Sequence, residues 1–178
     1  MIDIKKEIQE NDVLVVLFGE DYQKNLLDMI KNTEATYKKI CYITLNKPYN
    51  NLIEVLKKNS IDIEKFNFVD AITSTVIKPA SIKNCRFVTA PNALTELNLA
   101  IGKECISHNS DLFIFDSLSS LLIYEKGPTL IRFVHSVINE LRTYNIKIIF
   151  TLLKEDYVST LMKDLNMFVD KIIEIGKE

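Results

Sequence analysis

The sequence predicts an α/β fold of three layers (α/β/α), with a doubly wound, mostly parallel sheet between two layers of helices. Two observations support this prediction. Short runs that are apolar on both faces recur along the chain, as in strands of a parallel sheet that is covered by helices. Between them lie segments with apolar residues at three- and four-residue steps, as in amphipathic crossover helices. At 178 residues the chain has the usual length of one domain, and we expect residues 1–178 to form one.

Six segments have the composition of strands. Their bounds are Val13–Phe18, Lys39–Thr44, Arg86–Thr89, Leu112–Phe115, Ile146–Leu153 and Lys171–Ile175. The runs Val13–Phe18, Leu112–Phe115 and Ile146–Leu152 contain the fewest polar interruptions. We therefore expect these three strands at the centre of the sheet, where both faces are buried.

Five segments between these runs have helical spacing. Their apolar positions are Leu26, Leu27 and Ile30; Leu52, Ile53 and Leu56; Leu94, Leu97 and Ile101; Ile131, Val134, Ile138 and Leu141; and Leu161, Met162 and Leu165. The stretch Asp70–Asn84 has no periodicity and is rich in Thr, Ser and Pro. We expect a surface loop there.

The net charge of −2 and the pI near 5.8 provide no electrostatic drive toward nucleic acid or anionic lipid. We expect no nucleic-acid binding. No apolar run approaches the roughly 18 residues that span a bilayer, and Met1–Glu7 has no apolar core of a signal peptide. These features predict a cytoplasmic protein without a membrane segment.

The cysteines and histidines have no metal-ligand spacing. Cys41, Cys85 and Cys105 lie far apart, and neither His108 nor His135 has a suitably spaced partner. We expect buried, reduced thiols and no zinc site.

One motif carries a resemblance to a known family. The segment Asp111–Ser119 places four apolar residues before Asp116-Ser117, and it resembles the Walker B element of RecA-type ATPases, particularly the KaiC-like and RadA-like branch. Other parts follow in the family's order: the strand end at Gly19, the strand end Ile43–Asn46, the segment Ser60–Glu64, the helix Thr129–Tyr144 and the strand Lys147–Leu152. The resemblance implies a RecA-like core in which the Ile146–Leu152 strand lies between the other two central strands.

The phosphate loop of that family is degenerate in this sequence. Such a loop needs glycines, whose backbone N–H groups wrap phosphates, then a lysine and a Ser or Thr that holds magnesium. The corresponding stretch Gly19–Asn25 has one glycine, and Asn25 stands where the hydroxyl should be. Glu20 and Asp21 would oppose a triphosphate, at about 1 kcal/mol per contact in water. Gly19, Lys24, Asp116 and Ser117 remain as the residues of a vestigial nucleotide site.

The catalytic carboxylate is absent as well. In the family, acidic residues after the second strand orient the attacking water, but Thr44–Pro48 contains none. Since hydrolysis needs nucleotide, metal and oriented water together, we expect no catalytic residue and no cofactor; ATP with Mg²⁺ is the alternative.

The main hypothesis is a non-catalytic interaction or signalling module, a pseudo-ATPase. RecA-type domains commonly assemble side by side, so the resemblance implies a homo-oligomer or a protein partner such as an active ATPase relative. Tyr22, Tyr49 and Tyr124 fall near the predicted strand ends. Because tyrosine is enriched in interfaces, we expect the contact surface at that edge.

Other hypotheses stay open. A receiver-like phospho-acceptor would bind Mg²⁺ through Asp116 with Glu20 and Asp21, beside Thr151. The two acids could instead cap the following helix. A nucleotide-binding ATPase with a non-standard phosphate loop is a third possibility.

A hydrolase is the least supported hypothesis. Ser117, Ser119 and Ser120 precede His135, but no G-x-S-x-G elbow surrounds the serines. We expect them to turn the chain after the strand.

Overall fold

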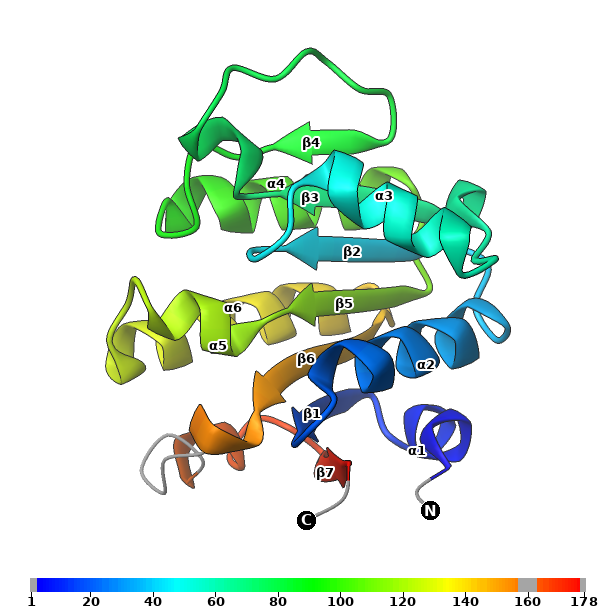
Figure 1. Ribbon diagram of the computed structural model, residues 1–178. Coiled ribbons are helices and arrows are strands. Elements are labelled where there is room, and N and C mark those ends of the chain that lie inside the picture. The colour runs from blue at the N-terminus through cyan, green and yellow to red at the C-terminus, as the bar shows by residue number, and fades with distance from the viewer. Residues whose placement is uncertain (1–2, 157–162, 177–178) are drawn as a thin grey trace.

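The computed structural model describes residues 3–156 and 163–176. Within them seven strands form one sheet, and each pair of neighbouring strands is parallel. Their order is β4-β3-β2-β5-β6-β1-β7. The strands are β1 (Val13–Phe18), β2 (Ile40–Thr44), β3 (Phe66–Asp70), β4 (Cys85–Phe87), β5 (Leu112–Asp116), β6 (Lys147–Leu153) and β7 (Lys171–Ile175). The predicted α/β fold is confirmed, and all carboxyl ends of the strands lie at one edge (Figure 1).

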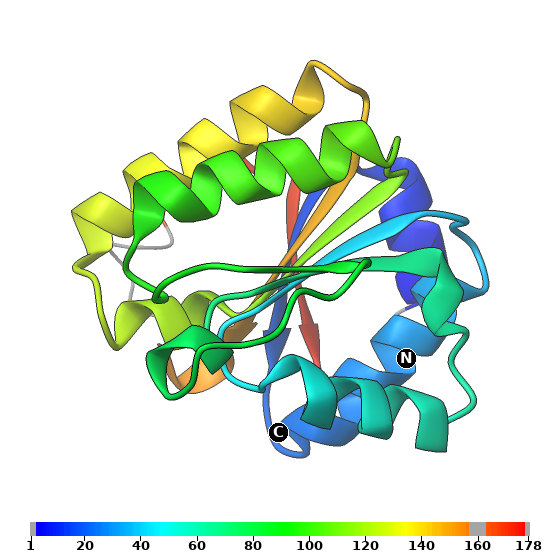
Figure 2. The ribbon, with the colours of Figure 1, turned by 90° about the horizontal axis from the view of Figure 1, so that it is seen from above.

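Helices cover both faces of the sheet. On one face lie α1 (Ile4–Glu10), α2 (Tyr22–Glu34) and α3 (Tyr49–Lys58), and on the other lie α4 (Leu94–Ser107) and α6 (Gly127–Arg142), as Figures 1 and 2 show together. The short α5 (Leu118–Leu122) follows β5 at the carboxyl edge. The described residues also form the 3-10 turns η1 (Ile63–Lys65), η2 (Thr73–Thr75) and η3 (Lys154–Asp156). None of the helices in the described ranges is long and apolar enough to cross a membrane.

Strand β1 shows why the apolar runs are continuous. Val13, Val15 and Leu17 belong to the core under α4 and α6, whereas Leu14 and Val16 belong to the core under α1, α2 and α3. Successive side chains of a strand point to opposite faces, so a strand buried on both faces needs an apolar residue at each position. Each such side chain contributes about 1.5–3 kcal/mol on burial.

The expected centre of the sheet is confirmed. Strand β6 lies between β5 and β1, and each of the three has a neighbour on both sides. The cysteines also lie where they were expected, since Cys41, Cys85 and Cys105 are buried and form no disulfide.

Strand β3 was missed, and the loop expected over Asp70–Asn84 begins too early. Phe66–Asp70 is a strand between β2 and β4, and its apolar run is interrupted by the half-buried Asn67. Asp70 and Ala71 are fully buried. The rest of the connection, residues 72–84, lies at the surface as predicted and exposes Val76 and Ile77.

Two further differences concern boundaries. The strand expected at Arg86–Thr89 is observed at Cys85–Phe87. The helical pattern of Leu161, Met162 and Leu165 begins outside the described residues; Leu165 itself is buried in the core under α6.

Candidate functional site at the carboxyl edge

Asp116 is the last residue of β5 and lies at the centre of the carboxyl edge, between β2 and β6. Ligands of open α/β sheets collect at this edge. Its side chain points to the α2 and α3 face because Ile114, two residues earlier, packs there. Only 2% of Asp116 is exposed. Asp116 is the aspartate of the segment that resembles a Walker B element, and in the structure its side chain is buried.

Four side chains from three neighbouring segments donate hydrogen bonds to this carboxylate. Tyr22, the first residue of α2, donates its hydroxyl to Oδ1. Tyr42 of β2 donates to Oδ2 at 2.7 Å, and Asn46 Nδ2 donates to Oδ1 at 3.2 Å. The Thr151 hydroxyl Oγ1 of β6 donates to Oδ1 at 3.4 Å. Both carboxylate oxygens are therefore engaged by the protein's own side chains.

Burial governs the electrostatics of this cluster. Desolvation raises the pKa of Asp116, and the hydrogen bonds from Tyr22, Tyr42 and Asn46, with the charge of Lys47, act in the opposite direction. Desolvation and the nearby Asp116 raise the pKa values of Tyr22 and Tyr42 well above that of free tyrosine. Both phenols are therefore protonated at neutral pH, and they act here as hydrogen-bond donors.

The segment that corresponds to a phosphate loop is a tight turn. Only Gly19–Asp21 separates β1 from α2. The Gly19 N–H already donates to the Ile175 carbonyl at 3.2 Å, so β7 uses a group that would otherwise face a ligand. Asp21 adopts φ 59° at the N-cap, but its side chain makes no capping bond. Glu20, Asp21 and Lys24 are exposed.

The residues considered for a metal site do not meet. Asp116 is buried, while Glu20 and Asp21 point to solvent. In residues 3–156 and 163–176 no group of three or more His, Cys, Asp and Glu side chains could hold a metal ion. Thr151 alone of the proposed set lies within reach of the carboxylate.

The serines after β5 have structural partners. Ser117 is the N-cap of α5, and its Oγ accepts a bond from the Ser120 N–H at 3.1 Å. Ser119 Oγ accepts a bond from the Leu153 N–H at 2.8 Å, which fastens the end of β6. His135 lies instead against Phe168, with ring centroids 4.3 Å apart. The serines thus turn the chain, as expected.

A hollow of about 360 Å³ lies beside this cluster. Its wall consists of hydroxyl, amide and apolar side chains with a single charge: Tyr22, Asn46, Ser117, Ser119, Ser120, Leu122, Ile123, Leu153 and Asp156. Polyphosphate needs positive charge and free backbone N–H groups. The wall has neither a lysine nor an arginine, and Asp116 has no unused oxygen. The wall of this hollow therefore offers no positive charge to a triphosphate.

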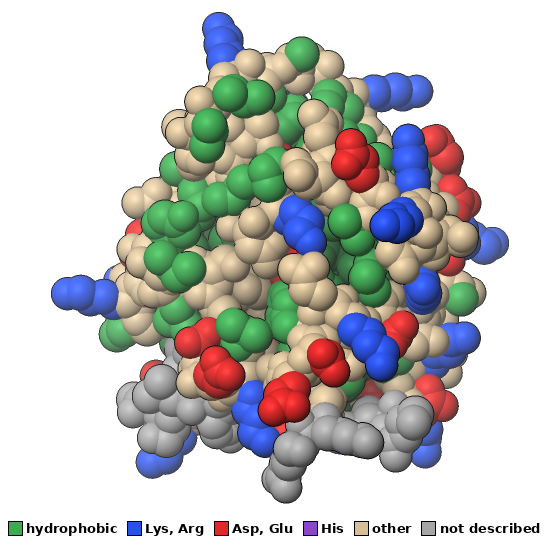
Figure 3. Space-filling model, viewed as in Figure 1, with side chains coloured by type: hydrophobic (Ala, Val, Ile, Leu, Met, Phe, Trp, Pro, Cys, Tyr) green, Lys and Arg blue, Asp and Glu red, His purple; other side chains and the backbone are tan. Residues whose placement is uncertain are grey.

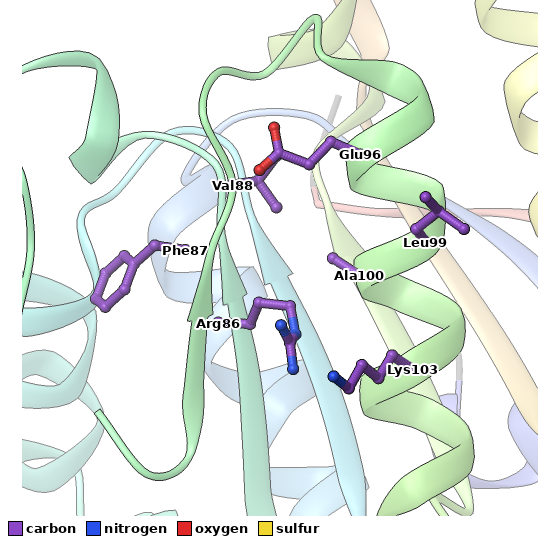
Figure 4. A pocket seen from close by; sticks show the side chains of 7 residues that line it. All are labelled: Arg86, Phe87, Val88, Glu96, Leu99, Ala100 and Lys103. Atoms are coloured by element: carbon purple, nitrogen blue, oxygen red, sulfur yellow. The ribbon is translucent and has the colours of Figure 1, made fainter. Parts of the chain in front are cut away.

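A second hollow, of about 180 Å³, lies at the edge of the sheet between β4 and α4. Figure 4 shows Arg86 from β4 and Lys103 from α4 extending toward this space, while Phe87 points to the other side of the sheet. The Arg86 Nε donates to Glu104 Oε1 at 2.7 Å, so its charge is balanced. Two strands, β3 and β2, separate this hollow from Asp116.

Sequence reasoning identified Asp116 and missed the role of its partners. Tyr22 and Tyr49 begin α2 and α3 as predicted, but their rings turn inward: Tyr49 is 8% exposed and its hydroxyl donates to Asn84. Tyr124 alone of the three expected tyrosines is exposed. The sequence offered one signal of these partners, Tyr42, because a tyrosine inside a buried strand needs a hydrogen-bond partner for its hydroxyl.

Comparison with known proteins agrees with this architecture. A KaiC-like protein, PH0186 from the hyperthermophilic archaeon Pyrococcus horikoshii, has a structure that matches with a TM-score of 0.68 at 14% sequence identity. The match covers 94% of this chain and 74% of that chain. No protein-family model matches the sequence, and the comparison with curated proteins finds no similar sequence. The likeness therefore establishes a RecA-like, KaiC-like fold.

Proposed function

We propose that this chain is a pseudo-ATPase: a KaiC-like domain that has kept the fold of the family, does not hydrolyse ATP, and acts through contacts with other proteins. One observation carries the proposal. The Asp116 carboxylate, which a Walker B element offers to magnesium, is engaged on both oxygens by Tyr22, Tyr42 and Asn46. A metal ion at this position would have to displace these hydrogen bonds, and loss of the bond from Tyr42 would leave a fully buried hydroxyl without its partner.

The turn after β1 supports the same proposal. A phosphate loop spans eight residues with two glycines before the helix, whereas Gly19–Asp21 is three residues long and ends in two acids. Two adjacent negative charges at the start of α2 repel a triphosphate at the place where the family binds one. Lys24 lies exposed on α2, outside the lining of the 360 Å³ hollow.

Calorimetry with ATP and MgCl₂ tests the nucleotide part. We expect no binding below millimolar concentration and no release of phosphate. The matched variant is Tyr22→Ala, which removes the side chain over Asp116. We expect no gain of ATP binding in this variant either, since the short acidic turn persists. A Kd in the low micromolar range, about −8 kcal/mol, for either protein would contradict the proposal and favour a nucleotide site with a non-standard loop.

The proposed contact surface lies at the carboxyl edge. Two connections there expose large apolar side chains: Val76 (82%) and Ile77 (59%) after β3, and Ile123 (78%) and Tyr124 (46%) after α5. Figure 3, viewed as Figure 1, shows apolar side chains gathered on the left of this face, where the strands end. Exposed apolar groups that cluster on one side indicate a binding surface.

The partner that we propose is a second copy of this chain or an active ATPase relative docked at that edge. No membrane and no nucleic acid enters the proposal, since the net charge of −2 offers no anion-binding field. The reduced thiols and the expected cytoplasmic location suit such a partner. Sedimentation velocity at micromolar concentration measures self-association directly.

A further inference from the structure

Another hollow lies at the opposite, amino-terminal end of the sheet. It has a volume of about 600 Å³ and is formed by the turn before β2, the turn before β5 and the turn before β6. Tyr37, Asn109, Ser110, Asp111, Tyr144 and Lys147 supply its polar and aromatic wall. Its size lies in the range of small-molecule sites.

Ser110 is buried in the floor of this hollow with its hydroxyl unpaired. It is 6% exposed, and its Oγ has no hydrogen-bond partner in the described part of the chain. Its N–H is satisfied by the Cys105 carbonyl at 2.9 Å, so the backbone is fixed while the hydroxyl stays available. Buried hydroxyl groups nearly always have a partner. Ser110 is one of the residues that line the hollow, so its unpaired hydroxyl belongs to the wall that a ligand would contact.

The cation in the wall is already used. Lys147 is the one lining residue with a positive charge among those described. Its Nζ donates to the Gln9 and Asn11 carbonyls at 3.3 and 3.2 Å and to Asp12 Oδ1 at 2.7 Å. An ammonium group has three N–H donors. No donor of Lys147 remains for an anionic ligand.

Negative charge is available in the same wall. Asp111 Oδ2 accepts the backbone N–H groups of Lys38 and Lys39, and these bonds orient the carboxylate without neutralising it. The pKa of Tyr37 is raised, mainly by burial and further by the negative charges of Asp111 and Asp12. The side chains of Lys38 and Lys39 do not line the hollow.

Two tyrosine rings complete the wall. Tyr37 is half-buried and Tyr144 is 53% exposed. Their ring faces carry negative charge density that attracts organic cations. Asn109 and Asn145 hold the two turns in the left-handed conformation, with φ of 49° and 56°. Both turns contribute residues to the wall of the hollow.

We propose that this amino-end hollow binds an organic cation, an alkylguanidinium or alkylammonium group, between Asp111, the Ser110 hydroxyl and the rings of Tyr37 and Tyr144. The site lies at the other end of the sheet from Asp116 and does not depend on the pseudo-ATPase proposal. The cation belongs either to a free small molecule or to an arginine or lysine side chain of another protein.

Titration of the full chain, followed by ¹H–¹⁵N correlation spectra, tests the proposal. The probes are agmatine, for a free cation, and N-acetyl-arginine-N-methylamide, for a side chain; N-acetyl-citrulline-N-methylamide is the uncharged control. We expect saturable shifts of the Asn109–Asp111 and Tyr144–Lys147 amides with the two cations and none with citrulline. Tighter binding of one cation identifies its source. Absence of shifts with both at 10 mM, or equal shifts with citrulline, overturns the proposal.

Variants locate the cation. We expect Asp111→Asn to weaken binding about tenfold and Tyr144→Ala about two- to fivefold. Ser110→Ala should weaken it about threefold. Tyr124→Ala, at the carboxyl edge, is the matched control and should change nothing. Because Tyr144 is exposed, its variant stays folded, and unchanged affinity in both Tyr144→Ala and Asp111→Asn also overturns the proposal.

Discussion

Two buried aspartates, Asp70 and Asp116, flank β2 at the same level of the sheet. Each is the last residue of its strand, and each pairs in register with Thr44. Their exposed fractions are 0% and 2%. They differ in the source of their hydrogen bonds. Asp70 accepts from the backbone N–H groups of Tyr49, Ile72 and Thr73 at 2.7–2.8 Å and from the Thr73 hydroxyl, whereas Asp116 accepts from side chains alone among the described residues.

The difference separates a structural carboxylate from one that can change its role. Backbone donors cannot be replaced by substitution, so Asp70 holds the start of α3 and the turn after β3 in one conformation. Side-chain donors can be replaced one at a time: Tyr22 donates to Asp116 from the start of α2, and Asn46 donates from the turn after β2. The donors of Asp116 can therefore be removed singly by substitution, which is not possible for the backbone donors of Asp70.

Substitution of Asp70 should have the largest effect on stability. Asp70→Ala leaves one buried and two part-buried N–H groups without an acceptor, at about 1–3 kcal/mol each, and we expect a loss of about 3–5 kcal/mol of unfolding free energy in urea. The matched control is Asp62→Ala. Asp62 is exposed and accepts one bond, from the Glu64 N–H at 3.1 Å. A loss below 1 kcal/mol in Asp70→Ala would contradict the structural role.

The next effect concerns pH. The pKa of Asp116 is raised in the folded state, so between its unfolded value of 3.8 and its folded value the unfolded chain releases a proton that the folded chain keeps. Stability from this group is complete below pH 3.8 and is lost as pH rises, by about 1.4 kcal/mol per pH unit inside that window. Asp116→Asn cannot titrate. We expect the native chain to lose stability relative to this variant as the pH rises above 4.

Urea unfolding of both proteins across this pH range measures the difference, and other titrating groups cancel in the comparison. A difference that is constant with pH, or that changes in the opposite direction, would contradict the desolvation of Asp116. Asp70→Asn is not a suitable control for this comparison, because the substitution disrupts the hydrogen bonds that Asp70 accepts from backbone N–H groups.

A smaller effect is expected at Tyr22. Tyr22→Phe removes the hydroxyl that donates to Asp116 and keeps the ring. That ring packs edge-on against Phe18, with the two ring centroids 5.2 Å apart. We expect a loss of about 1 kcal/mol in urea unfolding, and a further rise of the Asp116 pKa, since a bond that favours the charged form is gone. Tyr124→Phe, an exposed tyrosine, should be neutral. Equal stability of the native chain and Tyr22→Phe would separate Tyr22 from the carboxylate network.

The fold was largely predictable because burial on both faces leaves a local signature. Residues of β1 alternate between two cores, and this need is visible as an unbroken apolar run in Val13–Phe18. Strand β3 escaped because Asn67 breaks a five-residue run near the sheet edge. The strand conformation of this segment depends on its pairing with β2 and β4, which the local sequence pattern does not show.

The site was predictable only in part. Asp116 follows a buried strand, and that position alone places it at the carboxyl edge. Its partners depend on sheet order: Tyr42 and Tyr22 are 74 and 94 residues away in sequence. No periodicity encodes such a meeting. The same limit applies to Tyr49, whose ring was expected at the surface and packs inside against Phe68.

The smallest effect on stability, and the sharpest contrast between the two aspartates, lies in the connections that follow them. Each exposes two large apolar side chains: Val76 and Ile77 beyond Asp70, and Ile123 and Tyr124 beyond Asp116. Surface substitutions of this kind change stability by about 0.5 kcal/mol or less.

We expect association to depend on Ile123 and Tyr124, since Ile123 also lines the 360 Å³ hollow and tyrosine is enriched among the residues that contribute most to interfaces. Sedimentation velocity at micromolar concentration should show a lower mass for Ile123→Ser/Tyr124→Ser than for Val76→Ser/Ile77→Ser, which serves as the matched control. Equal masses for the two double variants would assign no contact to the Asp116 side, and a native chain that is monomeric throughout would end the homo-oligomer proposal.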